Sequence, residues 1–290
     1  MASPRAILKR TQSVKNIAKI TKTMQMIATA KFKRAHDRAV AARPYTDKLT
    51  RLIGKLAEAA GADFAHPLLE ARQPKKAVLI AISSNRGLCG GFNGNATKQA
   101  IAAYQGLKER GLDIELIASG KRVGSMLKFK GMEPDRLVTH IEDKPTFAEV
   151  DEIAAPLLER YAAGEIDEVH ISYTKFITAA RQQAVCEQVL PLETPEDDTE
   201  DAGAQRSFIF HPSAEQILSD LLPRSVRLHV FQAFLDSAVS EQTARMVAMK
   251  AATDNANEMI RDLTQLYNRS RQTQITTELS EIIGGAAALE

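Results

Sequence analysis

The chain has 290 residues, of which 44% are hydrophobic and 26% charged, as is typical of a folded protein with one large or two ordinary domains. Its two cysteines, Cys89 and Cys186, exclude a disulfide framework, and no apolar run approaches the roughly 20 residues that span a bilayer. The net charge of +2 hides a strong asymmetry: residues 1–55 hold fourteen Lys or Arg and two acids, whereas residues 193–201 hold six acids in nine positions.

Residues 1–60 carry the spacing of a long helix. Ser3 followed by Pro4 favours a helix start, and Gly61 favours its end. Pro44 is expected to kink or break the helix, because proline lacks a backbone N–H group. Apolar and small side chains recur at intervals of three and four residues, which is the pattern of a heptad seam. The seam consists of Val14, Ile17, Thr21, Met24, Ala28, Ala35, Ala42, Tyr45, Leu49, Leu52 and Leu56, with Ile20 and Ile27 widening it.

Residues 75–206 lack the heptad pattern of the first segment, and their alternating strand and helix signals predict an α/β domain. The continuous apolar run at 77–82 is typical of a strand buried on both faces. Thr146 and Glu149 form a capping-box pattern at the start of a helix. Strands are expected at 77–82, 114–118, 136–140, 168–174 and 183–192, helices at 94–110, 120–130 and 147–162, then a solvated acidic loop at 193–206 and a short edge strand at 208–211. Alternating strands and helices favour a largely parallel, Rossmann-like sheet.

Residues 207–290 predict a second long helix. Ser213 and Gln216 form another capping-box pattern, and Pro223 either kinks the helix or marks its true start. No Pro or Gly occurs in residues 224–283. The heptad seam consists of Leu235, Val239, Met246, Met249, Ala256, Ile260, Leu263 and Tyr267, with Gln242 and Thr253 as polar members. Because a sustained 3.5-residue period implies a partner helix, the two ends of the chain are expected to form an antiparallel coiled coil, with the α/β domain inserted between them.

A glycine-rich loop at residues 83–93 is the most enzyme-like feature. Such a loop after a buried strand can cradle phosphate with its backbone N–H groups. Its three glycines do not fit the dinucleotide-binding fingerprint, however, and no Gly-Lys-Ser/Thr follows. Tight strand-to-helix packing is the favoured interpretation, and Cys89 is expected to be a buried thiol rather than a nucleophile. The six histidines lack metal-ligand spacing, and His170 is expected on a strand face. Together with the interpretation of the glycine-rich loop and Cys89, this pattern predicts no cofactor, no metal and no catalytic residue.

The basic residues of the first helix admit two interpretations. They could neutralise nucleic-acid phosphates, or they could face an acidic protein surface. The positions concerned are 9, 10, 15, 19, 22, 31, 33, 34 and 38. An apolar seam committed to a partner helix favours a protein surface over nucleic acid. The last residues, 278–290, end the second helix in small uncharged side chains, which suggests that a partner encloses this tip.

Four blocks of the sequence resemble the gamma subunits of ATP synthases. The blocks are KITKTMQMIA at 19–28, SNRGLCGGFN at 84–93, SEQTARMVAMKAATDN at 240–255, and the run from LYNRSRQ at 266–272 to ITTELSEIIGGAAA at 275–288. They follow this order over essentially the whole chain. The sequence is therefore similar to bacterial members of this family.

The resemblance implies a non-catalytic rotor. In this family the paired terminal helices penetrate a ring of three alpha and three beta subunits, while the α/β domain sits on the membrane c-ring and binds the epsilon subunit. Such a chain would transmit torque between the c-ring and the catalytic ring, coupling proton translocation to ATP synthesis or hydrolysis. It would be a peripheral protein at the cytoplasmic face of the bacterial inner membrane.

The resemblance also implies roles for particular residues. Arg271 and Gln272 would contact a beta subunit. The zone that sets coupling between rotation and synthesis would contain Met24, Arg245, Thr276 and Glu278. The apolar bearing tip would consist of Ile282, Ile283, Ala286, Ala287, Ala288 and Leu289.

Overall fold

The computed structural model describes residues 4–61, 66–70, 72–192, 211 and 213–287. The chain divides into two compact units: unit 1 comprises residues 1–29 and 245–290, and unit 2 comprises residues 30–244. Both units contain segments of two long helices, α1 (Pro4–Ala60) and α5 (Ala214–Ala287). No helix among the described residues combines the length and the apolar character that a membrane span requires.

A five-stranded sheet forms the centre of unit 2. Its strands are β1 (Lys76–Ile82), β2 (Asp113–Ser119), β3 (Arg136–Val138), β4 (Glu168–Phe176) and β5 (Gln182–Leu190). Their spatial order is β3-β2-β1-β4-β5; the first four strands are parallel, and β5 runs antiparallel to β4. The expectation of a largely parallel sheet is therefore confirmed, although β3 ends two residues earlier than expected.

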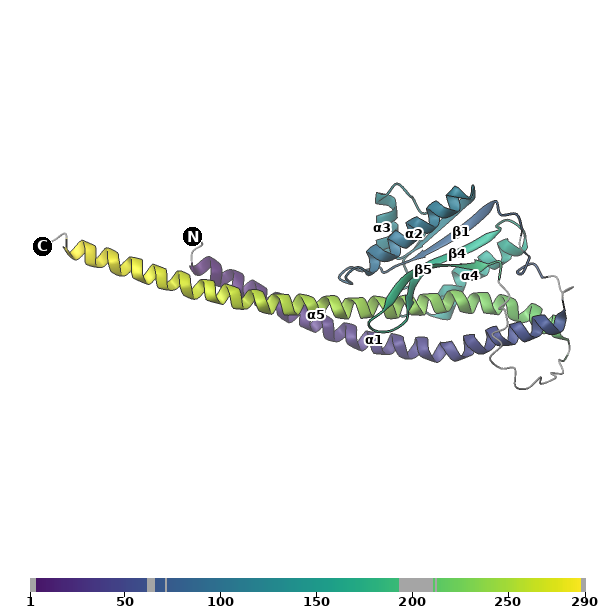
Figure 1. Ribbon diagram of the computed structural model, residues 1–290, viewed down its shortest axis with the longest axis horizontal. Helices are drawn as coiled ribbons and strands as arrows, with labels where there is room; N and C mark the ends of the chain where they lie inside the picture. The colour runs from purple at the N-terminus through teal and green to yellow at the C-terminus, as the bar shows by residue number, and fades with distance from the viewer. Residues whose placement is uncertain (1–3, 62–65, 71, 193–210, 212, 288–290) are drawn as a thin grey trace. The chain divides into compact units, whose positions relative to one another are not determined.

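Helices cover both faces of this sheet (Figure 1). On one face α2 (Phe92–Glu109) and α3 (Lys121–Phe129) share a core with Leu79 of β1 and its alternate neighbours. On the other face α4 (Phe147–Ala162) and segments of α1 and α5 pack against Ile80 and its alternate neighbours. Strand β1 is thus buried on both faces, as its continuous apolar run predicts.

Local sequence signals explain where several helices begin and end. At the start of α4, Thr146 Oγ1 accepts a hydrogen bond from the Glu149 N–H, and the Glu149 carboxylate accepts one from the Thr146 N–H, which completes the expected capping box. At the start of α5, Ser213 Oγ accepts from the Gln216 N–H. Helix α1 ends at Ala60, and the next residue, Gly61, has a positive φ of 80° and donates its N–H to the Ala57 carbonyl of the last turn.

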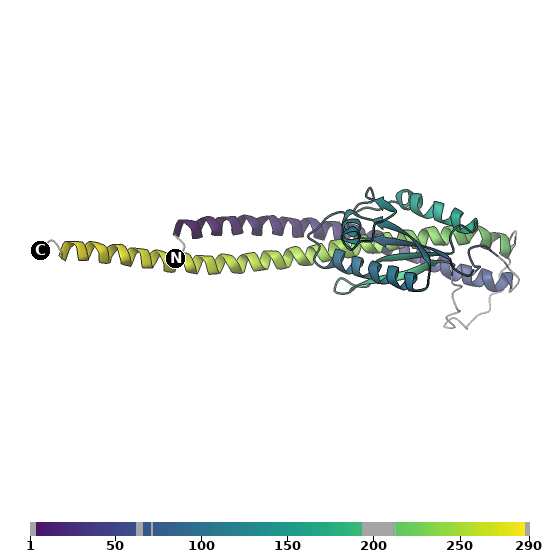
Figure 2. The same ribbon diagram turned by 90° about the horizontal axis from the view of Figure 1, so that it is seen from above.

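In unit 1, segment 4–29 of α1 lies beside the first part of segment 245–287 of α5 and runs in the opposite direction, and the rest of α5 extends past the start of α1 (Figures 1 and 2). Their shared core consists of Ile7, Val14, Ala18, Ala256 and Leu263, with Ile260 and Tyr267 partly buried beside it. In unit 2 the same two helices meet through Ala35, Ala39, Leu235 and Val239. The expected seam of the C-terminal helix therefore lies where it meets α1. The coiled-coil geometry of this pairing stays a prediction.

The seam of the first helix differs from the expectation. Five residues assigned to it are exposed instead: Ile17, Ile20, Ile27, Tyr45 and Leu52. Two apolar stripes are interleaved along α1, and the stripe with the smaller Ala18 faces α5 because small side chains let helices approach closely. Helix α1 also passes through Pro44 without a break, since packing on both sides of the proline outweighs one missing backbone hydrogen bond.

The second long helix does not start at Pro223, which was one of the two alternatives. It begins at Ala214, so Pro223 lies inside it rather than at its start. The N-cap residue Ser3, the acidic loop at 193–206 and residues 208–210 of the expected edge strand lie outside the described residues.

Candidate interaction surface of the paired helices

A basic groove runs along the two helices of unit 1. Its lining includes Lys15, Lys19 and Lys22 from α1, Lys250 from α5 and one carboxylate, that of Asp254. These groups leave a local charge of +3, four lysines minus one aspartate. Like charges three or four residues apart on a helix cost about 0.2–0.5 kcal/mol per pair. An acidic partner would remove that repulsion, so the groove is a candidate binding surface for one.

Large apolar side chains are exposed on the same helices. In the unit 1 segment of α1 they are Leu8, Ile17, Ile20, Met26 and Ile27, and in that of α5 they are Val247, Met259, Leu266, Ile275, Leu279, Ile282 and Ile283. Every residue from 271 to 286 of α5 is exposed, and the apolar ones recur at intervals of three and four. This spacing places them on one face as a continuous stripe. A stripe of this kind marks a surface that another molecule covers.

The residues expected to contact a beta subunit lie on this exposed end of α5. Arg271 and Gln272 are both exposed, and the Gln272 carbonyl accepts a hydrogen bond from Thr276 Oγ1 at 2.9 Å. Glu278 is also exposed and accepts from Gln274 Nε2 at 2.8 Å. These bonds join residues four apart on one helix, so they stiffen the exposed end without tying it to α1.

The expected coupling zone is not a single cluster. Met24 is half-buried and Arg245 is 9% exposed, and both lie where α1 and α5 are paired in unit 1. Thr276 lies 31 residues after Arg245 on α5, which is about 45 Å at 1.5 Å per residue. The residues expected to set coupling therefore lie at two separate places, one where α1 and α5 are paired and one on the exposed end of α5.

The expected bearing tip is described in part. Ile282, Ile283 and Ala286 are exposed, and Ala287 is the last residue of α5. Ala288 and Leu289 lie outside the described residues.

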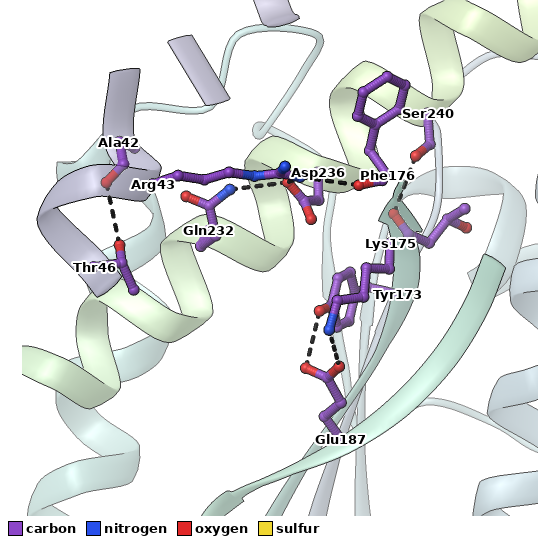
Figure 3. A network of polar contacts seen from close by, with 11 residues as sticks. Ala42, Arg43, Thr46, Tyr173, Lys175, Phe176, Glu187, Gln232, Asp236 and Ser240 are labelled. Carbon is purple, nitrogen blue, oxygen red and sulfur yellow. Dashed lines mark hydrogen bonds and ion pairs between the residues drawn. The ribbon is translucent and has the colours of Figure 1, made fainter. Parts of the chain in front are cut away.

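A polar network in unit 2 ties α5 to α1 and to the end of β4 (Figure 3). Arg43 of α1 donates from Nη2 to the Phe176 carbonyl at 2.9 Å and lies 3.5 Å from the Asp236 carboxylate. Gln232 Nε2 also donates to Asp236, at 2.9 Å, and Ser240 Oγ donates to a carbonyl of β4 at 3.2 Å. Burial raises the pKa of Asp236 even though Gln232 and Arg43 both favour its charged form.

A second cluster in unit 2 centres on Glu187 of β5. Its carboxylate accepts hydrogen bonds from the Tyr173 hydroxyl at 2.9 Å and from Lys175 Nζ at 3.0 Å (Figure 3), and it lies 3.4 Å from His229 of α5. Hydrogen bonding from His229, helped by Lys175 and Tyr173, lowers the pKa of Glu187 to about 2 against the effect of burial. Burial also raises the pKa of Tyr173, which keeps its hydroxyl a donor at neutral pH.

Sequence reasoning missed both networks, because each depends on a residue of α5 that meets strands or a helix far from it in the sequence. Arg43 and Asp236 are 193 residues apart in the sequence. One signal was available: Asp236 follows the apolar run Ala233, Phe234 and Leu235 in a helix seam, where a carboxylate needs a partner.

The glycine-rich loop is held by local packing. Asn93 Oδ1 accepts from the N–H and the O–H of Ser84, at 3.1 and 2.8 Å, and the Cys89 thiol is buried as expected. Gly120, with a φ of 111°, lies so close to the Ser83 carbonyl that a Cβ atom there would clash. His170 lies on β4 as expected, 2.8 Å from Glu168. Across the described part of the chain, no three His, Cys, Asp or Glu gather as a metal site would require.

The sequence matches a known family over almost its whole length. The family model described as ATP synthase matches residues 3–289. An ATP synthase gamma chain from Rhodopirellula baltica is 45% identical over 298 residues, which cover all of both chains. Gamma chains from Acidovorax sp. (strain JS42) and Desulforamulus reducens are 39% and 40% identical, again over all of both chains. The chain belongs to the ATP synthase gamma chain family. As a gamma chain, it is a non-catalytic subunit of ATP synthase.

Solved structures show the same fold. A chain in a structure of the Euglena gracilis mitochondrial ATP synthase rotor superposes with a TM-score of 0.63 at 21% identity, over 94% of this chain and 98% of that one. A chain in the OSCP/F1/c-ring structure of the same enzyme superposes with a TM-score of 0.66 at 22% identity, over 99% of this chain and 94% of that one. At these identities the likeness concerns the fold of a gamma chain alone.

Proposed function

We propose that this gamma chain is the central-stalk rotor of a bacterial ATP synthase. It transmits torque between a proton-driven c-ring and a catalytic ring of alpha and beta subunits, and so couples proton translocation to ATP synthesis or hydrolysis. The observation that carries the proposal is the exposed end of α5, where residues 271–286 lie in solvent with an apolar stripe along one face. A helix in this state needs an enclosing partner.

The chemistry of this end suits a turning contact. Leu279, Ile282, Ile283 and Ala286 offer no side-chain hydrogen bonds. Hydrogen bonds prefer particular angles and would hold the helix at one rotational position, whereas apolar contact is non-directional. An apolar sleeve formed by the alpha and beta subunits would therefore hold the tip on its axis and still let it turn.

The basic groove supports the same partners. Its charge of +3 would attract acidic segments of the beta subunits as the shaft passes them. Exposed apolar residues elsewhere on the same segment of α1, such as Ile20 and Ile27, would add contact area. No nucleic-acid partner is proposed, because these apolar residues suit a protein surface.

The remaining parts of the proposal follow the family resemblance. Residues 1–60 and 207–290 would form an antiparallel coiled coil, and residues 75–206 a Rossmann-like domain that sits on the c-ring and binds the epsilon subunit. Arg271 and Gln272 would hydrogen-bond a beta subunit. The residues that set coupling would be Met24, Arg245, Thr276 and Glu278. The chain would lie peripherally at the cytoplasmic face of the inner membrane.

The test compares two double variants on α5 in the assembled enzyme. Leu279→Ser with Ile283→Ser removes two large side chains of the stripe, whereas Thr277→Ser with Glu281→Ser changes a different face at the same spacing. The stripe variant should lose most proton-driven ATP synthesis in membrane vesicles, and the control should retain it. A tagged chain should also co-purify with alpha, beta, epsilon and c subunits. Undiminished synthesis in the stripe variant would refute the bearing role.

A further inference from the structure

Leu88 has an unfavourable backbone conformation inside the glycine-rich loop. Its φ of 64° lies in the left-handed region, and it is the one non-glycine residue with a positive φ in the described part of the chain. In this region the Cβ atom of an L-residue is crowded by a carbonyl oxygen, so glycine is the residue that adopts it freely. The other left-handed position of the same loop is indeed a glycine, Gly90, with a φ of 56°.

The leucine side chain gains little burial in exchange. Leu88 is 61% exposed, whereas the next residue, Cys89, is 1% exposed. A leucine stabilises a fold mainly by leaving water, so most of that contribution is missing here. None of the hydrophobic clusters of the described residues includes Leu88. A strained backbone that brings no packing within the chain points to a role outside the chain.

Hydrogen bonds on both sides of Leu88 hold this conformation. Before it, Asn93 Nδ2 donates to the Arg86 carbonyl at 3.2 Å. After it, the Phe92 N–H donates to the Cys89 carbonyl at 3.2 Å. The two bonds fix both ends of a short segment, so the φ of Leu88 cannot relax without breaking one of them. The leucine is therefore presented to solvent by a rigid loop.

Cations border the exposed leucine. The Arg122 guanidinium lies against the glycine that precedes Leu88. Arg86 and Lys121 are also exposed, and one carboxylate, that of Glu142, lies 3.4 Å from Arg86. These groups leave a local charge of +2, three cations minus one carboxylate. An apolar side chain within a basic rim fits a partner surface that has an apolar pocket beside carboxylates.

We propose that Leu88 is a contact residue for the catalytic ring, where its side chain enters an apolar pocket in an acidic segment of a beta subunit. The rim around Leu88 has the same sign of charge as the basic groove, which the proposed function assigns to acidic segments of the beta subunits. The left-handed backbone destabilises the isolated chain and is kept because it exposes the leucine. The identity of the partner rests on the proposed function, whereas the strain is measurable on the chain alone.

The first test separates the backbone from the side chain. Leu88→Ala and Leu88→Gly both remove the exposed side chain, but only alanine keeps a Cβ atom. In urea unfolding of the full chain, the folding equilibrium constant of Leu88→Gly should exceed that of Leu88→Ala by about 2- to 10-fold, a range that allows for the greater freedom of glycine in the unfolded chain. Leu88→Ala should stay within about 2-fold of the parent. No gain from glycine, or a larger loss in Leu88→Ala, would overturn the inference, because the leucine would then be unstrained or packed within the chain.

The second test measures the contact in the assembled enzyme. Proton-driven ATP synthesis in membrane vesicles should fall about 3-fold or more in Leu88→Ala and Leu88→Gly, because burying a leucine against a partner contributes about 10-fold to the contact equilibrium. Leu88→Met keeps an apolar side chain and should retain the rate. The matched control is Leu137→Ala, since Leu137 is 54% exposed in the same unit and has no positive φ. Parent rates in Leu88→Ala and Leu88→Gly would overturn the contact.

A photoreactive side chain identifies the partner. With p-benzoylphenylalanine at position 88 of the assembled enzyme, the crosslinked peptide should be an acidic segment of a beta subunit. No crosslink, or crosslinks to other subunits alone, would overturn the choice of partner. The rotor proposal fails separately, through parent rates in the Leu279→Ser with Ile283→Ser variant or loss of co-purification with the ring, so the two failures are distinguishable.

Discussion

Gln242 lies in the buried seam of α5 without a partner for its amide. The residue has no exposed surface, and neither Nε2 nor Oε1 has a hydrogen-bond partner among the described residues. Leu235 and Val239, seven and three residues earlier, belong to the cluster that packs against α1 in unit 2. Gln242→Met should therefore stabilise the chain, because methionine is similarly unbranched and carries an apolar thioether.

The size of the effect follows from the unpaired amide. Burying an amide without a hydrogen bond costs about 1–3 kcal/mol in proteins. Glutamine and methionine have nearly equal helix propensities, so the backbone contributes little to the difference. The free energy of unfolding should rise by about 1–2 kcal/mol, with a thermal midpoint higher by about 2–4 °C for each kcal/mol.

Urea unfolding followed by far-ultraviolet circular dichroism measures this change. The matched control is Gln232→Met, the same substitution ten residues earlier on α5. Gln232 donates to the buried Asp236 at 2.9 Å, although its own Oε1 has no partner among the described residues, so the control loses one bond and should gain less stability than Gln242→Met. Destabilisation of the Gln242→Met chain by about 1 kcal/mol would refute the reasoning, because it would show that the amide is satisfied in solution, for instance by bound water.

Three further outcomes are expected. The pKa of Glu187 in the folded chain is about 2, which is below its value in the unfolded chain. Its contribution to the free energy of unfolding is therefore complete above the unfolded pKa and is lost as the pH falls through the folded pKa. Between about pH 6 and pH 2, the free energy of unfolding measured by urea titration should fall by on the order of 2 kcal/mol more in the parent than in Glu187→Gln. Parallel curves of unfolding free energy against pH would contradict this. In the same assay, Arg43→Met should lower the free energy of unfolding by about 2 kcal/mol, because it removes the cation beside Asp236. Adding Asp236→Asn should recover most of that loss. An equal loss in the double variant would exclude the ion pair as the cause. Leu279→Ser with Ile283→Ser should change the unfolding free energy by less than about 1 kcal/mol, since both side chains are exposed, and a larger loss would mean that they pack within the chain.

Elements with a strong local pattern could be predicted from the sequence. The apolar run at 77–82 became a strand buried on both faces, and the Thr146–Glu149 capping box opens α4. The seam of α5 was also identified, including its polar members Gln242 and Thr253. Each of these depends on neighbours in the sequence, through backbone capping or helical spacing, and so is visible without a structure.

In the first helix, the spacing of apolar residues does not determine which side chains are buried. Ile17 and Ala18 both fit a repeat of three and four, but only Ala18 faces α5. A helix with two apolar stripes can bury either, and the choice depends on the shape of the partner. The candidate binding surface of α1 therefore includes isoleucines that the sequence had assigned to the interior.

Periodicity and charge are local properties, and they were enough to predict two long helices with apolar seams, a largely parallel α/β sheet between them and a basic first helix. The pairing of distant residues is visible only in three dimensions: the fold shows which stripe of α1 faces α5, that Arg43 meets Asp236, and that Thr21 bonds Thr253 while the Gln242 amide has no partner in the described chain. These pairings join residues about 200 positions apart. They depend on how two helices approach and align, which no local pattern encodes.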